Sequence, residues 1–200
     1  MSGPVAIIDS GGANIASLQF ALQRLGVRAG LTTTADEIRA ARRVILPGVG
    51  AAGDAMERLR HHALIDVIRD LEQPVLGVCL GMQLLAEASE EEDVECLGII
   101  PGVATRLEPD TGFPVPNMGW CPVTMSDPHA LFDGIDDGSY FYFVHGYALP
   151  VSEYTLAVAR HTNPFSAVFG RDNFIATQFH PERSSTDGAR LLRNFLGTDA

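Results

Sequence analysis

The sequence contains no lysine, and all 14 of its basic residues are arginine. A Walker A phosphate-binding loop needs a lysine, and so does the Schiff base of a pyridoxal phosphate enzyme, so both kinds of site are excluded. The 25 acidic residues outnumber the basic ones and leave a formal net charge of −11. A nucleic-acid-binding protein would normally carry a basic patch, and this balance argues against one.

Cysteines and long apolar segments are scarce too. Cys79, Cys96 and Cys121 lie far apart, without CxxC or Cys/His pairing, so neither a disulfide framework nor a zinc site is expected. No segment approaches the roughly 18 uninterrupted apolar residues of a membrane span. The start, MSGPVAIID, lacks the basic region of a signal peptide. These features predict a cytoplasmic protein with no metal, no cofactor, and no nucleic-acid or membrane partner.

The first half of the chain alternates strand-like and helix-like segments. A length of 200 residues fits one domain with a full core, and we expect a single domain over 1–200. The expected strands cover 4–9, 42–48 and 73–79, and the expected helices cover 14–26, 54–70 and 80–88. This alternation predicts a parallel sheet with helices on both faces.

The second half is mostly strand-like. Apolar runs occupy 97–107, 120–125, 140–150, 154–160, 165–173 and 174–180, and a helix is expected over 185–196. The last two runs read as a hairpin that turns at Asp172 and Asn173. The predicted fold class is α/β: a single-domain, flavodoxin-like three-layer sandwich. Its central sheet is mostly parallel, with an antiparallel C-terminal extension.

Cys79 stands at the end of a strand-like run, in the stretch GVCLG. Functional groups of open parallel sheets gather at the carboxyl ends of the strands. Glycines two positions on either side fit the sharp turn of a nucleophile elbow, and the start of the following helix favours a thiolate. Cysteine is also among the residues most often buried. GxCxG alone therefore leaves two alternatives, a nucleophile or an inert core residue.

The stretch QFHPE at 178–182 supplies what a thiol nucleophile would need. His180 directly follows a strand-like run, and Glu182 stands two residues later, where its carboxylate can orient the imidazole. A thiol nucleophile requires a base, and the base requires a group that holds it. His-Pro-Glu at the end of a strand, in a chain with a cysteine elbow, favours the nucleophile.

With GVCLGMQ and QFHPE in this order, the chain resembles the class I (triad) glutamine amidotransferases, which release ammonia from glutamine. The resemblance implies Cys79 as nucleophile, His180 as base and Glu182 as the residue that orients it. It implies that the PGVG loop, with Gly48, Val49 and Gly50, forms the oxyanion hole. Glycine at both ends would let one peptide of this loop rotate.

The resemblance also implies a glutamine-binding set. Its members are Gln83, Glu91, His145, Gly146 and Tyr147. For His145 and Tyr147 the resemblance implies that their backbone lines the pocket, and simple packing is the alternative. Glu91 belongs to the acidic run SEEEDVE at 89–95, which otherwise reads as a solvated loop.

The flanking motifs narrow the resemblance to the glutaminase subunits of imidazole glycerol phosphate synthase, the HisH type of histidine biosynthesis. They are DSGGANIAS, LPGVGAAGDAM, LGIIPG, PNMGW, YFVHGY and QFHPERS, and they span residues 9 to 184. The resemblance implies a heterodimer with a separate (βα)8 barrel cyclase. That subunit uses the ammonia to form imidazole glycerol phosphate and an aminoimidazole carboxamide ribotide. Asn14, Trp120 and Arg183 are expected near the contact.

The chain departs from the usual motifs of this type at five positions, none in the triad. They are Ser10, Ala13, Asn117, Cys121 and Ala176. Three other readings compete with the resemblance: a stand-alone cysteine hydrolase on a related fold, a catalytically silent binding domain, and a glutaminase of anthranilate or aminodeoxychorismate synthesis. The intact triad argues against the silent domain, and PGVGAAGDAM with PNMGW favours the histidine pathway.

Overall fold

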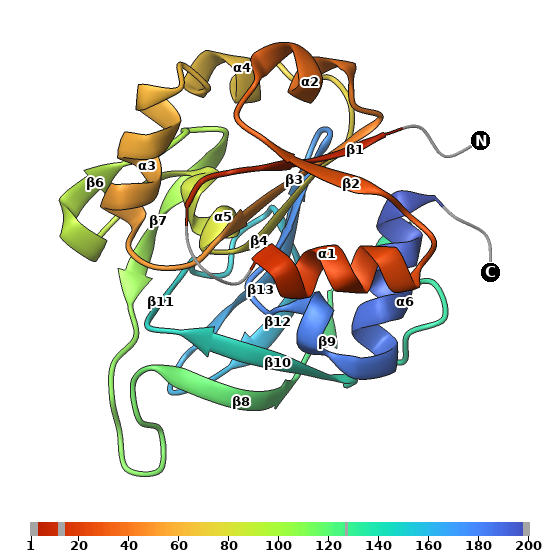
Figure 1. Ribbon diagram of the computed structural model, residues 1–200. Helices are drawn as coiled ribbons and strands as arrows, with labels where there is room; N and C mark the ends of the chain where they lie inside the picture. The colour runs from red at the N-terminus through yellow and green to blue at the C-terminus, as the bar shows by residue number, and fades with distance from the viewer. Residues whose placement is uncertain (1–3, 12–14, 127, 198–200) are drawn as a thin grey trace.

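The structure, a computed structural model, describes residues 4–11, 15–126 and 128–197. An eight-stranded sheet forms its centre, in the order β2-β1-β3-β4-β14-β13-β12-β9 (Figure 1). The strands from β2 to β14 pair in parallel, and the pairs from β14 to β9 are antiparallel. The bounds are β1 (Val5–Ile8), β2 (Ala29–Thr32), β3 (Arg43–Gly48), β4 (Val75–Cys79), β9 (Thr124–Met125), β12 (Thr155–Arg160), β13 (Pro164–Arg171) and β14 (Phe174–Thr177).

Helices cover both faces of this sheet, as the alternation of segments predicts. Helices α1 (Ile15–Arg24) and α6 (Ser185–Leu196) pack on one face, and α2 (Ala35–Ala40), α3 (Ala52–His61), α4 (Ile65–Arg69) and α5 (Leu80–Leu84) pack on the other. Strand β1 contributes to both cores: Val5 and Ile7 face α1 and α6, whereas Ala6 and Ile8 face the second group. This period of two follows from the pleat. The predicted three-layer α/β fold is confirmed.

Two smaller sheets lie beside the central one. Strands β8 (Asn117–Pro122) and β10 (Tyr140–His145) pair antiparallel, and β11 (Tyr147–Ala148), β7 (Ile100–Arg106), β5 (Ala86–Ser89) and β6 (Val94–Glu95) form a four-stranded sheet. Short 3-10 helices occur at η1 (Glu91–Asp93), η2 (Ala130–Phe132) and η3 (Pro181–Arg183). The strand-like runs of the second half thus belong to three sheets. None of the described helices is long and apolar enough to cross a lipid bilayer.

The single helix expected over 54–70 is wrong, because the chain breaks it into α3 and α4. Ala63 adopts a left-handed conformation with φ of 54°. The amide of Leu64 then donates to the carbonyl of Leu59 at 2.9 Å, the long bond of a Schellman motif. Leu64 is fully buried by this turn. The burial of Leu64 therefore ends the helix here, although the spacing of apolar residues in the sequence predicts that it continues.

The helix expected over 80–88 is also too long. Helix α5 ends at Leu84, and the chain continues as β5. The amides of Ile99 and Ile100 both donate to the carbonyl of Leu85, at 3.0 and 2.9 Å, and β5 pairs in parallel with β7. A partner segment some 15 residues away thus converts the end of the helix into a strand, as long-range pairing often overrides local propensity.

Strand β4 and helix α5 meet in a turn that only glycine permits at its two flanks. A Cβ atom at Gly77 would lie 2.9 Å from the Cβ of Ala176 on β14. At Gly81 it would overlap the carbonyl of Leu46 on β3. The sequence-based explanation of these glycines, close approach of strand and helix, is confirmed. The hairpin at Asp172 is confirmed as well, since β13 and β14 pair up to Arg171 and Phe174.

We expect Gly81→Ala to destabilise the fold. Its methyl group has no space against the Leu46 carbonyl, and overpacking of a core typically costs about 1 to 3 kcal/mol. Gly30→Ala on β2 is the matched control, because nothing lies within 4 Å of a Cβ there, and its effect should stay within about 0.5 kcal/mol. Urea unfolding followed by circular dichroism measures both. Equal free energies of unfolding for the two variants would contradict the packing argument.

Candidate active site

Cys79 occupies a strained position at the carboxyl end of β4. Its backbone has φ of 55° and ψ of −112°, and it directly precedes α5. A residue other than glycine at such angles costs of order 1 to 3 kcal/mol and persists only where the surrounding packing enforces it. The close contacts at Gly77 and Gly81 provide that packing. The result is the sharp strand-to-helix turn expected of a nucleophile elbow.

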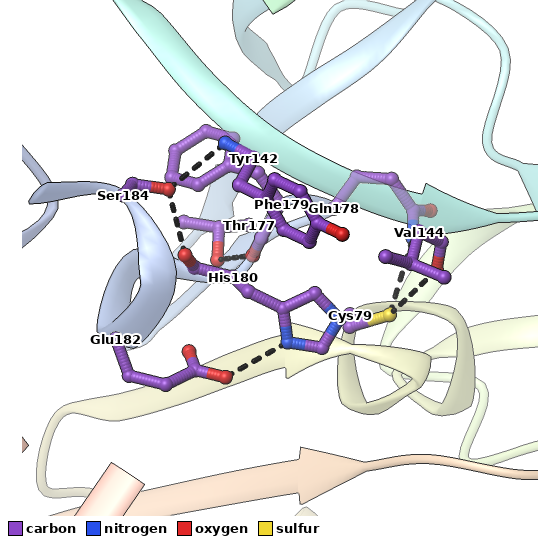
Figure 2. A network of polar contacts seen from close by, with 9 residues as sticks. All are labelled: Cys79, Tyr142, Val144, Thr177, Gln178, Phe179, His180, Glu182 and Ser184. Carbon is purple, nitrogen blue, oxygen red and sulfur yellow. Dashed lines mark hydrogen bonds and ion pairs between the residues drawn. The ribbon is translucent and has the colours of Figure 1, made fainter. Parts of the chain in front are cut away.

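His180 reaches Cys79 because β14 runs in parallel next to β4. Thr177 pairs with Val78, so the residues after β14 leave the sheet beside the end of β4. The amide of His180 donates to the carbonyl of Tyr142 at 2.9 Å, and the hydroxyl of Ser184 donates to the carbonyl of His180 at 2.7 Å. Figure 2 shows the ring of His180 between the side chains of Glu182 and Cys79. Both backbone bonds fix the direction in which the ring projects.

Glu182 accepts a hydrogen bond from His180, with 2.9 Å between Oε1 and Nδ1. Both side chains are buried. Because a carboxylate can only accept, Nδ1 carries a proton and the other ring nitrogen is left for Cys79. Burial lowers the pKa of His180, but hydrogen bonds and charge interactions with Cys79 and Glu182 outweigh it and raise the pKa to about 10. The site thus stabilises a protonated imidazole.

Two further groups surround the sulfur of Cys79, and neither was singled out from the sequence. The carbonyl oxygen of Val144 on β10 lies 3.7 Å from Sγ. The side-chain nitrogen of Gln178 lies 3.9 Å from it. Gln178 belongs to the QFHPE motif, and its place in that motif, two residues before the predicted base, was the available signal. Val144 contributes only its backbone carbonyl, so the identity of its side chain gives no sign of this contact in the sequence.

Cys79 opens into a pocket of about 320 Å³. This volume lies within the range of small-molecule sites. Most of the residues predicted from the sequence line it together: Val49, Gly50, Cys79, Gln83, Glu91, His145, Gly146, Tyr147, His180 and Arg183. Leu80, Pro116 and Val144 complete the lining. Gly48 and Glu182 instead border a small adjoining cavity behind His180. Asn14 lies outside the described residues.

Gln83 and His145 use their side chains mainly to hold the pocket wall. The Gln83 amide nitrogen donates to the carbonyl of Tyr147 at 2.9 Å and to Oε1 of Gln178 at 3.1 Å. His145 Nδ1 also lies 2.9 Å from the Tyr147 carbonyl, and its Nε2 lies 3.0 Å from the side-chain nitrogen of Asn117. Burial lowers the pKa of His145 to about 4, so this ring is neutral. His145 thus lines the pocket while both nitrogens of its ring are engaged by Tyr147 and Asn117.

The acidic run at 89–95 is solvated over most of its length, since residues 90, 92, 93 and 95 are exposed, but it is not a plain loop. Ser89 is buried on β5, and Glu91 begins η1 at the edge of the pocket. The Glu91 carboxylate accepts a hydrogen bond from the amide of Ala52, the first residue of α3, at 2.9 Å. A carboxylate is favourable at a helix N-terminus. Packing and helix capping therefore order the segment despite its charge.

The PGVG segment begins in the last two residues of β3, and the final one, Gly48, pairs with Cys79. A Cβ atom at Gly48 would lie 2.7 Å from the Cβ of Leu80, so glycine is needed there for packing against α5. Gly50 has φ of +95° and open space around it. Within this loop Gly50 combines a glycine-specific backbone with room to move, whereas Gly48 is held by the sheet. Ser10 also holds this loop, since its hydroxyl donates to the carbonyl of Pro47 at 2.6 Å.

An apolar face adjoins the pocket mouth on the β8–β10 sheet. Trp120 is 50% exposed and meets the ring of Tyr142 edge-on, with 5.9 Å between ring centroids. The Arg183 guanidinium lies 4.6 Å above the centroid of the same ring. Met118 and Tyr140, which share this face, are 65% and 57% exposed. We define the outer face as Met118, Trp120, Tyr140 and Tyr142.

Comparison with known proteins agrees with this geometry. The family model described as "Glutamine amidotransferase class-I" matches residues 6–198. Among curated proteins, the imidazole glycerol phosphate synthase subunit HisH of Shewanella oneidensis is 49% identical, over 96% of this chain and 95% of that protein. The protein of the same name from Xanthomonas axonopodis pv. citri is 50% identical, over 96% of each.

Solved structures share the fold at much lower identity. A crystal structure described as a glutamine amidotransferase superposes with a TM-score of 0.74 at 20% identity, covering 96% of this chain and 97% of that one. A structure described as PurLQS from Thermotoga maritima gives 0.71 at 17% identity, covering 98% and 99%. At these identities the likeness concerns the fold alone.

We expect Glu182→Gln to lower the pKa of His180 by at least about one unit, because the partner carboxylate is lost. In the native protein the pKa of about 10 lies above the ordinary value near 6.5. Protonated His180 therefore stabilises the fold fully below about pH 6.5, and this contribution is lost as pH rises through about 10. Long-range ¹H–¹⁵N NMR of the His180 imidazole measures the change. An unchanged His180 titration in the variant would contradict the assignment.

Proposed function

The chain belongs to the class-I glutamine amidotransferases, and within them to the HisH type, and from this premise we propose that it releases ammonia from glutamine through a thioester on Cys79. One observation carries the proposal: a strained cysteine at a strand end meets a buried His180–Glu182 pair at the wall of a ligand-sized pocket. A nucleophile, a base and a group that orients the base are what acyl transfer requires.

In the first half of the reaction, the sulfur of Cys79 attacks the side-chain amide carbon of glutamine. The carbonyl oxygen becomes an oxyanion, and backbone N–H groups of Val49 and Gly50 in the PGVG loop stabilise it. The N–H of Leu80, the residue after the nucleophile, is suited to the same role. Protonated His180 then gives its proton to the leaving nitrogen, the carbon–nitrogen bond breaks, and ammonia departs from the thioester.

In the second half, water hydrolyses the thioester. His180 accepts a proton from the water as its oxygen attacks the carbonyl carbon, and the carbon–sulfur bond breaks to give glutamate and free Cys79. Glu182 keeps the ring aligned through both halves by its 2.9 Å bond to Nδ1. No metal or cofactor enters this scheme. For the glutamine itself we propose contacts with Gln83, Glu91, and the backbone of His145, Gly146 and Tyr147, all of which line the pocket.

The relatives are named as subunits of imidazole glycerol phosphate synthase, and we propose the same assembly for this chain. The partner is the (βα)8 barrel cyclase of histidine biosynthesis, which uses the ammonia to make imidazole glycerol phosphate and the aminoimidazole carboxamide ribotide. The outer face and Arg183 support a contact here, since exposed aromatic and arginine side chains are enriched at protein interfaces. Asn14 belongs to the same proposed contact.

We further propose that residues 1–200 act as one glutaminase domain in the cytoplasm. The two apolar cores lie on opposite faces of one sheet, which supports a single unit. All three cysteines are free. A thiol nucleophile needs a compartment in which thiols remain reduced, and the cytosol is such a compartment.

Cys79→Ser is expected to abolish glutamine-dependent synthesis by the complex. The hydroxyl replaces the only group proposed to attack glutamine, and loss of a nucleophile typically costs several orders of magnitude in rate. Synthesis from added ammonium salt should persist, because free ammonia bypasses this subunit's chemistry. Both rates are measured on the reconstituted complex, with Cys96→Ser as the matched control that should keep glutamine-dependent synthesis. Substantial glutaminase activity of Cys79→Ser would refute the proposed function.

We expect the isolated chain to hydrolyse glutamine slowly, and the cyclase with its nucleotide ligand to accelerate it by about 100- to 1000-fold. A change of that size corresponds to gaining one oxyanion-hole donor, and rotation of a peptide beside Gly50 can supply it. Glutamate release by the chain alone and with the partner measures the effect. Full turnover by the chain alone would favour a stand-alone hydrolase.

Binding of the cyclase should depend on the outer face. Trp120→Ala is expected to weaken binding at least about tenfold, as truncation of a buried tryptophan at an interface commonly does. Phe20→Ala is the matched control, because Phe20 is an exposed aromatic residue of α1 that does not line the pocket. Isothermal titration with the purified cyclase compares the two. Equal affinities would move the contact to another face.

A further inference from the structure

Two buried glutamine side chains connect the sulfur of Cys79 with the wall of the pocket. Gln178 is fully buried and Gln83 is 4% exposed. The amide nitrogen of Gln178 lies 3.9 Å from Sγ of Cys79 (Figure 2), and its amide oxygen lies 3.1 Å from the amide nitrogen of Gln83. A buried amide is costly unless it is bonded, so these contacts decide how both side chains are oriented.

The contact with the Tyr147 carbonyl fixes the direction of both amides. A backbone carbonyl can only accept, so the Gln83 atom 2.9 Å from it must be the NH₂ group. The second hydrogen of that NH₂ group points to the nearby amide oxygen of Gln178. The NH₂ group of Gln178 is then left to face the sulfur. Turning the Gln83 amide by 180° would place its oxygen against the Tyr147 carbonyl oxygen. Turning the Gln178 amide would place its NH₂ group against the NH₂ group of Gln83.

His145 holds the Tyr147 carbonyl in place from the other side. Nδ1 of His145 lies 2.9 Å from this carbonyl and must carry a hydrogen, so Nε2 accepts from the side-chain nitrogen of Asn117 at 3.0 Å. The carbonyl therefore accepts two hydrogen bonds and resists rotation away from Gln83. These bonds join the β8–β10 sheet to Cys79 in one continuous network.

At the sulfur, two contacts act in opposite directions. The carbonyl of Val144, at 3.7 Å, can accept a bond from a thiol but has no favourable interaction with a thiolate. The NH₂ group of Gln178 can donate to a thiolate, and hydrogen bonds to a charged group are the stronger kind. Protonated His180 approaches the sulfur as well (Figure 2). The donor group of Gln178 and the acceptor group of Val144 therefore face the same sulfur.

We propose that Gln178 is a second hydrogen-bond donor to the Cys79 thiolate, beside His180, and that Gln83 is the positioning residue that aims its amide at the sulfur. The proposal rests on Cys79 being the nucleophile of the proposed function. It gives Gln83 a task beyond lining the pocket, and it makes Gln178 part of the reacting centre.

The test is the pH dependence of Cys79 alkylation by iodoacetamide, which requires no glutamine turnover. Peptide mass spectrometry quantifies modification at Cys79 alone, separately from Cys96 and Cys121. Gln178→Met, a similar shape without a donor, should lower the alkylation rate at pH 6 by about threefold to tenfold, the usual worth of one hydrogen bond. It should also move the midpoint of the profile to higher pH. Gln178→Glu should lower the rate further, because a carboxylate repels the thiolate.

Gln83→Met tests the positioning role and remains informative if the Gln178 variants fold poorly. It should move the midpoint in the same direction by a smaller amount, because the Gln178 amide is then free to turn. Gln23→Met, at an exposed position of α1, is the matched control and should leave the profile unchanged. Unchanged midpoints in folded Gln178→Met and Gln83→Met would overturn the proposal. Glutaminase activity in Cys79→Ser would instead overturn the proposed function, so the two failures are distinguishable.

Discussion

The close packing of α5 against the end of β3 is the constraint on which the site depends. It requires glycine at 48 and 81, where a Cβ atom would meet Leu80 or the Leu46 carbonyl, and it holds Cys79 at φ of 55°. The energy of that strained backbone is offset by the buried apolar contacts of α5. If a methyl group at position 48 or 81 pushed α5 away from β3, the strained backbone of Cys79 would relax. Gln83, on the same helix, would then move away from its hydrogen-bond partners. Nucleophile and pocket wall therefore share one geometric origin.

Parallel pairing brings the remaining groups to the same place. Strand β4 lies between β3 and β14, so the PGVG loop and the QFHPE segment emerge on either side of Cys79. The hairpin at Asp172 returns the chain so that β14 runs parallel to β4. Asn173 anchors this return, because its side-chain amide donates to the carbonyls of Leu71 and Gln73 at 2.7 and 2.9 Å. A turn far from the chemistry thus determines where His180 leaves the sheet.

The sequence was sufficient to predict features that local chemistry decides. Alternating segments predicted the layers, the glycines around Cys79 predicted a tight turn, and HPE predicted the contact between His180 and Glu182. The sequence was insufficient to predict where helices end when contacts with distant segments determine their ends. The end of α5 depends on amides at 99 and 100, and the break at Ala63 depends on burial of Leu64. The contact of Gln178 with Cys79 was missed because the QFHPE motif places Gln178 near the base but does not show where its amide points, which depends on Gln83 and Tyr147.

Strand β10 links the outer face directly to the reacting groups. The ring of Tyr142 contacts both Trp120 and Arg183, while its backbone carbonyl accepts from the amide of His180 and its backbone amide donates to Ser184. Two residues later, the carbonyl of Val144 faces the sulfur. The side chains of this short strand thus form part of the outer face, while its backbone contacts His180 and Cys79. A partner bound at the outer face would therefore lie against the same strand that places a carbonyl beside Cys79.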